Sequence, residues 1–131
     1  MIVVDTSVLV AILQVEPEAR VLVTAMQRTS AVGMSAVTLL EAGVVMRSKR
    51  GPAGVVSLER LLVRAKIALF PFNEAMARIA IEAFSQYGRR SGSKAKLNFG
   101  DCASYALAKA LDVPLLFKGD DFSQTDIVSA L

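Results

Sequence analysis

The N-terminal stretch MIVVDTSVLVAIL, residues 1–13, predicts the start of an α/β fold. Met1–Val4 is a short apolar run rich in β-branched residues, as is typical of a strand buried in a parallel sheet. The run stops at Asp5, and residues 6–14 continue with the spacing of a short helix. Similar apolar runs predict further strands at 32–35, 67–72 and 114–117. Because helical segments separate them, the pattern indicates an α/β fold around a parallel sheet.

The helical segments carry their own start and stop signals. Glu16-Pro17-Glu18 is typical of a helix start, with proline at the first position and acids in the first turn. Ser35 or Thr38 is suited to cap the following helix, and Thr38 to Glu41 has the spacing of a capping box. Gly51-Pro52 ends that helix. Further helices are predicted at 54–65, 74–87 and 101–111, and residues 88–96 are expected to form a loop or a frayed helix end.

Composition excludes several classes of protein. A chain of 131 residues that is 53% hydrophobic fits one folded domain spanning 1–131. One cysteine and no histidine exclude a disulfide framework, a zinc finger and a Ser-His or Cys-His catalytic pair. The longest uncharged stretch, residues 29–40, is too short to cross a membrane, and the N-terminus lacks the basic lead-in of a signal peptide. We therefore expect a cytoplasmic protein with no membrane association.

Five acids occupy positions where apolar, core-facing residues are expected. They are Asp5, Glu41, Asp101, Asp120 and Asp121. Each one alone has a structural interpretation, because Asp5 and Asp101 can cap helices and Glu41 can close a capping box. Together, however, carboxylates at the carboxyl ends of parallel strands repel one another unless cations lie between them. Hard divalent ions, Mg²⁺ or Mn²⁺, are the natural partners, and such sites hydrolyse phosphodiesters.

Basic residues gather in two short segments. One holds Arg47, Lys49 and Arg50, and the other holds Arg89, Arg90, Lys94 and Lys96. Either segment can be a solvated face of the molecule. If four of the twelve acids form one pocket, the remaining eight face 15 basic residues, a balance of +7. A basic body around an acidic, metal-filled pocket suits a polyanionic substrate.

Four motifs resemble a known family. They are VVDTSVLVAIL at the N-terminus, SAVTLLEAGVVM, LNFGDCASYALAKALDVPLLFKGDDF and SQTDI near the end. In this order and spacing they are similar to PIN-domain ribonucleases, and most of all to VapC-type toxins of toxin–antitoxin pairs. The resemblance covers nearly the whole chain. It implies a single PIN domain over 1–131 with three α/β/α layers and a central, mainly parallel sheet of four to five strands.

The resemblance also implies residue roles. Asp5, Glu41 and Asp101 match the first three metal-binding acids of the family, and the fourth is Asp120 or Asp121 in the GDDF segment. Thr6 and Ser7 match the hydroxyl positions beside the first acid, or else cap the first helix. Thr125 and Asp126 either hold the metal-site loop or cap a final turn. One or two Mg²⁺ or Mn²⁺ ions would activate water, and both basic segments would position the RNA backbone.

Two other functions compete with an endoribonuclease toxin. A receiver-like phosphoacceptor domain is also small, α/β and rich in strand-end acids, but it needs an adjacent acidic pair after its first strand, where this chain has Asp5-Thr6-Ser7. A catalytically idle PIN fold could serve as a binding module. The apolar richness reflects either a well-filled core or partner contacts. The family implies RNA (transfer, ribosomal or messenger), a small antitoxin, and a homodimer within a heterotetramer or larger assembly.

Overall fold

A four-stranded parallel sheet lies at the centre of the computed structural model, which describes residues 1–131, all of the chain. The strand order is β3-β2-β1-β4, with Val3 in register with Gly33 on one side and with Leu115 on the other. The predicted α/β fold with a parallel sheet is therefore confirmed. The strands are β1 (Ile2–Val4), β2 (Val32–Ser35), β3 (Ile67–Phe70) and β4 (Leu115–Leu116).

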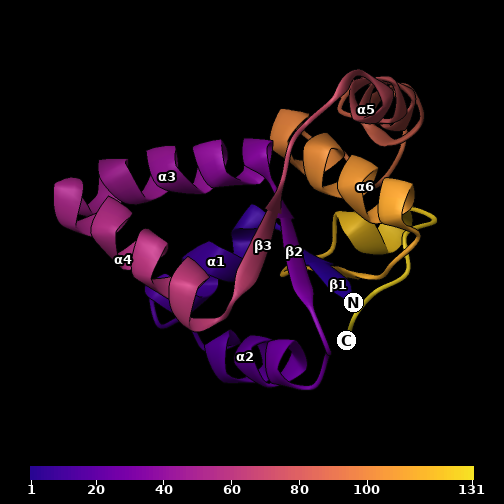
Figure 1. Ribbon diagram of the computed structural model, residues 1–131. Helices are drawn as coiled ribbons and strands as arrows, with labels where there is room; N and C mark the ends of the chain where they lie inside the picture. The colour runs from indigo at the N-terminus through magenta and orange to yellow at the C-terminus, as the bar shows by residue number, and fades with distance from the viewer.

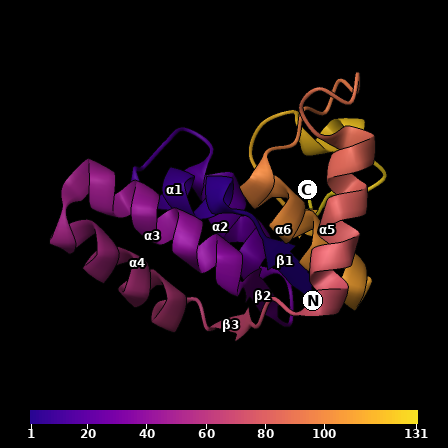
Figure 2. The ribbon, with the colours of Figure 1, turned by 90° about the horizontal axis from the view of Figure 1, so that it is seen from above.

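Six α-helices cover the two faces of this sheet. Figures 1 and 2 show α1 to α4 on one face and α5 and α6 on the other. No helix is long and apolar enough to cross a membrane. The helices are α1 (Thr6–Leu13), α2 (Ala19–Gln27), α3 (Ala36–Arg50), α4 (Pro52–Arg64), α5 (Glu74–Tyr87) and α6 (Phe99–Leu111), and a 3-10 helix, η1, spans Phe122–Gln124.

Alternation along β1 divides the apolar core into two halves. Ile2 and Val4 point into a cluster with helices α1, α2 and α4, whereas Val3 points into a second cluster with α5 and α6. Successive strand side chains face opposite sides of a sheet, so an uninterrupted apolar run requires cover on both faces. This requirement is why Met1–Val4 reads as a buried strand and why the fold has three layers.

Several element boundaries differ from the sequence prediction. Helix α3 begins at Ala36 because the Ser35 side chain accepts a hydrogen bond from the Val37 N–H, so Thr38 and Glu41 lie inside the helix and form no capping box. Helix α2 begins at Ala19, because Glu16, Pro17 and Glu18 form turns rather than its first turn. Strand β3 stops at Phe70, two residues earlier than predicted, and β4 keeps only Leu115 and Leu116.

Helices α3 and α4 form a tight antiparallel pair. A Cβ atom placed on Gly54 would lie 2.3 Å from the Met46 carbonyl oxygen, so the absence of a side chain sets how closely α4 approaches α3. Gly43, on α3, is different, because a Cβ there would meet only Leu58 Cδ2 at 4.0 Å, an ordinary contact. Gly43 therefore has room for a methyl group, whereas Gly54 has none.

We expect Gly54→Ala to lower the free energy of unfolding by about 1–3 kcal/mol, because a backbone carbonyl cannot move aside as a flexible side chain can. Gly43→Ala is the matched control. It should raise the free energy of unfolding by up to about 1 kcal/mol, since alanine is the better helix former and the space is open. Urea unfolding of the two variants and the wild type measures both effects. Equal stability changes for the two variants would contradict the close α3–α4 approach.

Candidate active site

Asp5 is held at the point where β1 becomes α1. Its side chain accepts a hydrogen bond from the Ser7 N–H at 3.0 Å and so caps α1, as the sequence suggested. The other carboxylate oxygen accepts a hydrogen bond from the Ser104 hydroxyl at 2.6 Å. Only 3% of Asp5 is exposed to solvent. Two hydrogen bonds therefore fix a nearly buried carboxylate at the carboxyl end of the sheet.

Ser104 is a site residue that sequence reasoning missed. It lies on α6, is completely buried, and its hydroxyl is 3.2 Å from that of Thr38 on α3. Hydrogen bonds from Thr38 through Ser104 to Asp5 therefore connect α3 and α6 to the start of α1. The sequence did hold a signal for this role, because Ser104 is a polar residue within the apolar run Cys102–Ala108 and follows Asp101 by three positions.

Glu41 reaches the same region from the second turn of α3, although it closes no capping box. Its carboxylate packs against the backbone of Gly100, so a Cβ on that glycine would lie 2.1 Å from Glu41 Oε2. Gly100 therefore makes room for Glu41 beside the first turn of α6. In this position Glu41 lies next to Asp101, which follows Gly100 directly.

Asp101 is the third residue of α6 rather than its first. It forms a capping box with Asn98, in which each side chain accepts a hydrogen bond from the other residue's N–H. Burial raises the pKa of Asp101 to about 7, with further increases from the charges of Asp5, Asp121 and Glu41 and an opposing effect of the Asn98 N–H. Four carboxylates thus act on one another here, and we call Asp5, Glu41, Asp101 and Asp121 the acidic cluster.

Asp121, rather than Asp120, belongs to this cluster. Both lie four to five residues beyond β4, in the bend before η1, and are exposed, so neither closes the strand as predicted. Of these two acids, only Asp121 contributes to the raised pKa of Asp101. The buried ring of Phe122 follows directly and anchors the bend in the core.

Thr125 and Asp126 hold this bend in place. The Asp126 carboxylate accepts hydrogen bonds from the Tyr105 hydroxyl at 2.6 Å and from Lys109 Nζ at 2.8 Å, both on α6. The Thr125 hydroxyl donates to the Phe122 carbonyl and accepts from the Ile127 N–H, closing a local turn. Of the two roles left open for this pair, Asp126 fixes the bend on α6 and Thr125 stabilises the turn itself.

Thr6 and Ser7 differ in their surroundings. The Ser7 hydroxyl accepts a hydrogen bond from the Lys118 N–H and so ties the start of α1 to the segment after β4. The Thr6 hydroxyl is buried beside Asp5 and has no hydrogen-bond partner within the protein. A buried hydroxyl without a partner is uncommon in folded proteins and indicates a missing polar ligand or water.

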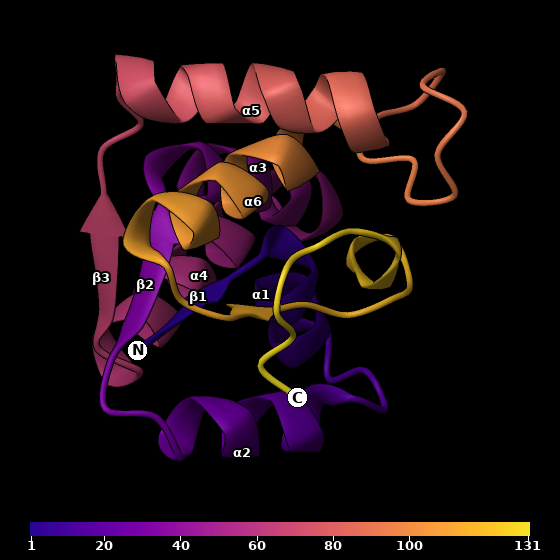
Figure 3. The same cartoon turned by 90° about the vertical axis from the view of Figure 1, so that its right-hand side faces the viewer.

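The two basic segments lie in different places. Arg47, Lys49 and Arg50 are exposed in the last turn of α3, where Arg50 donates to the carbonyl of Leu13, and the helical rise puts Arg50 about 13 Å beyond Glu41. The other segment is a loop, not a frayed helix, and Figure 3 shows it projecting past the end of α5. All four of its basic side chains are exposed, those of Arg89, Arg90, Lys94 and Lys96.

This loop lies beside the acidic cluster. Arg89, Arg90 and Lys96 line a depression of about 500 Å³ together with Asp121. The buried side chains of Ala95 and Leu97 fasten its return limb to the core. The structure therefore brings this basic segment, and not the one on α3, to the edge of the carboxylates.

Comparison with known proteins identifies the family to which this parallel-sheet fold belongs. The PIN domain family model matches residues 2–128. The chain belongs to the PIN domain family. Ribonuclease VapC28 of Mycobacterium tuberculosis is 42% identical over 129 residues, which cover 98% of this chain and 97% of that protein. This similarity places the chain with the VapC proteins of the PIN family and favours that assignment over the receiver-like alternative.

Solved structures show the same fold at low identity. The sarcin–ricin loop cleaving toxin VapC20 of Mycobacterium tuberculosis superposes with a TM-score of 0.80 at 17% identity, covering 98% of this PIN domain and 97% of that chain. A toxin–antitoxin complex from Klebsiella pneumoniae gives a TM-score of 0.73 at 16% identity, covering 100% and 98%. At these identities the comparison establishes a three-layer PIN fold across the whole chain.

The raised pKa of Asp101 predicts a pH-dependent stability. The folded protein holds the Asp101 proton up to about pH 7, whereas the unfolded chain releases it near its ordinary value of 3.8. Protonation therefore favours folding, so the stabilisation is complete below about pH 4 and is lost as the pH rises through 7. In EDTA, we expect the free energy of unfolding to fall between pH 5 and pH 8, measured by urea titration.

Asp101→Asn should remove most of this fall, because asparagine keeps the hydrogen bond from Asn98 and carries no charge. Asp120→Asn is the matched control, since this neighbouring exposed acid does not affect the pKa of Asp101. It should leave the pH dependence as in the wild type. The same slope in Asp101→Asn as in the wild type would show that folding does not raise the pKa of Asp101.

Proposed function

We propose that this PIN domain is a metal-dependent endoribonuclease, the toxin of a type II toxin–antitoxin pair acting on RNA in the cytoplasm. The observation that carries the proposal is the meeting of four carboxylates, at the N-cap of α1, on α3, on α6 and in the bend before η1. Burial and mutual repulsion there raise the pKa of Asp101 to about 7. Support also comes from the 42% identical relatives, which are named as VapC ribonucleases.

The cluster suits one or two Mg²⁺ or Mn²⁺ ions by the chemistry of its donors. Carboxylate oxygens are the ligands these ions prefer, and the partnerless Thr6 hydroxyl marks a place for a further polar ligand beside Asp5. No three of these carboxylates lie close enough together in the structure to ligate one ion, so binding requires rotation of the Glu41 and Asp121 side chains, which no hydrogen bond holds. When bound, such an ion acts as a Lewis acid on the phosphate and lowers the pKa of a coordinated water.

The protein's own residues have supporting tasks in this reaction. Ser7 and Ser104 hold Asp5 in one orientation, and Asn98 does the same for Asp101. Cys102, the one thiol, is buried, and burial together with the charge of Asp101 raises its pKa to about 11. The thiol is therefore protonated and not a nucleophile at neutral pH, which is consistent with water as the attacking group.

Positive charge beside the cluster supports RNA as the substrate. Arg89, Arg90 and Lys96 share a depression with Asp121, and Lys94 extends the same loop. We assign these side chains to the RNA backbone, which they would position without reading the sequence. The segment Arg47–Arg50 is a more distant contact, and the hydrogen bond of Arg50 to Leu13 gives that residue a structural task as well.

An antitoxin partner is supported by a similar solved structure, described as a toxin–antitoxin complex. Large apolar side chains remain exposed on α3, where Leu40 and Val44 lie one helical turn apart. Neighbouring exposed apolar side chains of this kind suit a protein interface. We assign it to a homodimer that pairs with antitoxin chains in a heterotetramer or larger assembly.

Asp5→Asn should reduce RNA cleavage at least 100-fold while leaving the fold intact, because asparagine caps a helix as well as aspartate does. EDTA should stop wild-type cleavage, and Mg²⁺ or Mn²⁺ should restore it. Mn²⁺ should also raise the melting temperature of the wild type but not of Asp5→Asn, a result independent of activity. Gel assays of labelled RNA and thermal melts measure these effects.

Asp120→Asn is the control for this experiment, since it removes one acid of the same GDDF segment outside the cluster. It should cleave RNA at nearly the wild-type rate. An Asp5→Asn protein that cleaves at the wild-type rate, or full activity in EDTA, would refute a metal site at the acidic cluster.

A further inference from the structure

A pocket of about 550 Å³ lies between the end of α5, the loop that follows it and the first turn of α6. Its lining combines two aromatic rings, Phe84 and Phe99, with the two arginines Arg89 and Arg90. We call it the aromatic-basic pocket. Asn98 also lines it, but its side-chain oxygen is occupied by the Asp101 N–H in the capping box. A ligand would therefore meet the aromatic rings and the arginines, together with the smaller polar groups of Ser85, Ser91 and Asn98 Nδ2.

Phe99 is exposed to an unusual degree for an aromatic residue. Its exposed fraction is 82%, the highest among the large apolar residues of the chain, whereas Phe117 and Phe122 are buried. It is the first residue of α6, where helix formation does not require an aromatic ring. A phenylalanine kept in water gives up its hydrophobic stabilisation, so its ring is available for contact with a ligand.

The pocket adjoins the acidic cluster on two sides. Phe99 precedes Gly100, whose backbone contacts the Glu41 carboxylate, and it lies two residues before Asp101. On the other side, Arg89 and Arg90 line both this pocket and the depression that contains Asp121. A strand whose phosphate lies at the carboxylates would therefore pass the arginines and carry its neighbouring nucleotide to the Phe99 ring.

We propose that the aromatic-basic pocket binds an unpaired nucleobase of the RNA strand, stacked on Phe99, with the flanking phosphates on Arg89 and Arg90. This inference rests on the proposed ribonuclease function and adds a positioning residue to it. Proteins hold single-stranded RNA by stacking bases on exposed aromatic rings beside a basic track. The stacked base fixes which phosphate reaches the carboxylates, so Phe99 acts on substrate placement rather than on the chemical step.

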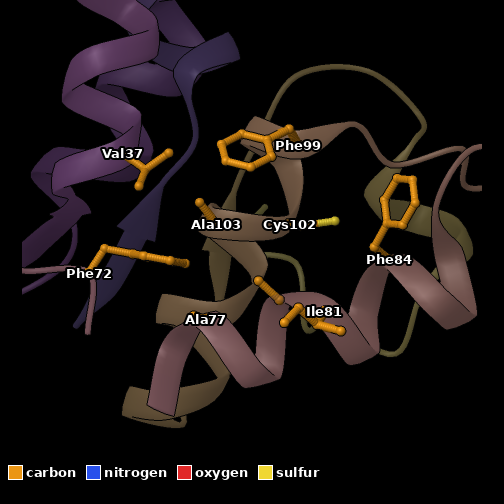
Figure 4. Close-up of a pocket in the computed structure, with 9 residues that line it drawn as sticks. Val37, Phe72, Ala77, Ile81, Phe84, Phe99, Cys102 and Ala103 are labelled. Carbon is orange, nitrogen blue, oxygen red and sulfur yellow. The ribbon is translucent and has the colours of Figure 1, made fainter. Parts of the chain in front are cut away.

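An adjoining apolar pocket of about 510 Å³ offers a different use of the same rings. Figure 4 shows Val37, Phe72 and Ile81 among its lining side chains, and Phe84 and Phe99 belong to both pockets. A second copy of the chain would cover this wholly apolar side and bury Ile81. Of these two adjoining pockets, only the aromatic-basic pocket is lined by the arginines, and their charge complements phosphates. This charge complementarity favours a nucleotide over an apolar protein surface as the occupant.

The chain contains no tryptophan, so Phe99→Trp creates a single fluorescent probe at the pocket. In an Asp5→Asn background, which prevents cutting, a short single-stranded RNA should quench this fluorescence and bind with wild-type affinity. Phe99→Ala should weaken binding about 5- to 140-fold, the loss of one stacked base. Ile81→Ala is the matched control, because Ile81 lines only the apolar pocket, and its RNA affinity should be unchanged.

Unquenched Phe99→Trp fluorescence together with unchanged affinity of Phe99→Ala would overturn the inference. Light scattering tests the other occupant. If Phe99→Ala and Ile81→Ala convert the protein from dimer to monomer while the RNA affinity stays unchanged, the rings contact a second copy of the chain instead. Wild-type cleavage separates the two proposals. Cleavage without quenching refutes only the nucleobase site, and quenching without cleavage refutes only the ribonuclease function. The absence of both cleavage and quenching refutes both proposals.

Discussion

Mutual repulsion between carboxylates at one end of a parallel sheet is the constraint on which the rest of this structure depends. Strand β1 delivers Asp5 to that end, and the first turn of α6 places Asp101 there. Burial and the neighbouring acids raise the pKa of Asp101 to about 7. The fold tolerates this repulsion in part by giving two of the carboxylates hydrogen-bond partners of their own. Asp5 has Ser7 and Ser104, and Asp101 has Asn98.

Helix capping and metal binding are therefore not competing explanations of the same acids. The sequence offered capping as the structural interpretation of Asp5 and Asp101, and both do accept hydrogen bonds from backbone N–H groups. Capping fixes where each carboxylate lies, which is what a cation site needs from its ligands. Glu41 differs, because it caps nothing. Its approach depends on Gly100, whose missing side chain leaves room for the carboxylate.

Local patterns predicted the elements but not the contacts between distant segments. Met1–Val4 was identifiable as a buried strand because its side chains need cover on both faces, and the end of α3 was identifiable from Gly51-Pro52. The helix start at Ser35 was ambiguous, since Thr38 has similar capping chemistry. Family motifs indicated Asp5, Glu41 and Asp101 but left Asp120 and Asp121 equivalent. Ser104 escaped notice because its bond to Asp5 spans 99 positions of sequence, which no local pattern encodes.

The central claim is that Asp5, Glu41, Asp101 and Asp121 share a divalent cation. A crystal structure of the protein grown with Mn²⁺ tests it most directly, because anomalous scattering locates the metal independently of the protein atoms. We predict an anomalous peak within coordination distance, about 2.0–2.2 Å, of carboxylate oxygens from at least three of these four residues. A protein that cleaves RNA with Mn²⁺ but shows its manganese only elsewhere on the surface would contradict the account.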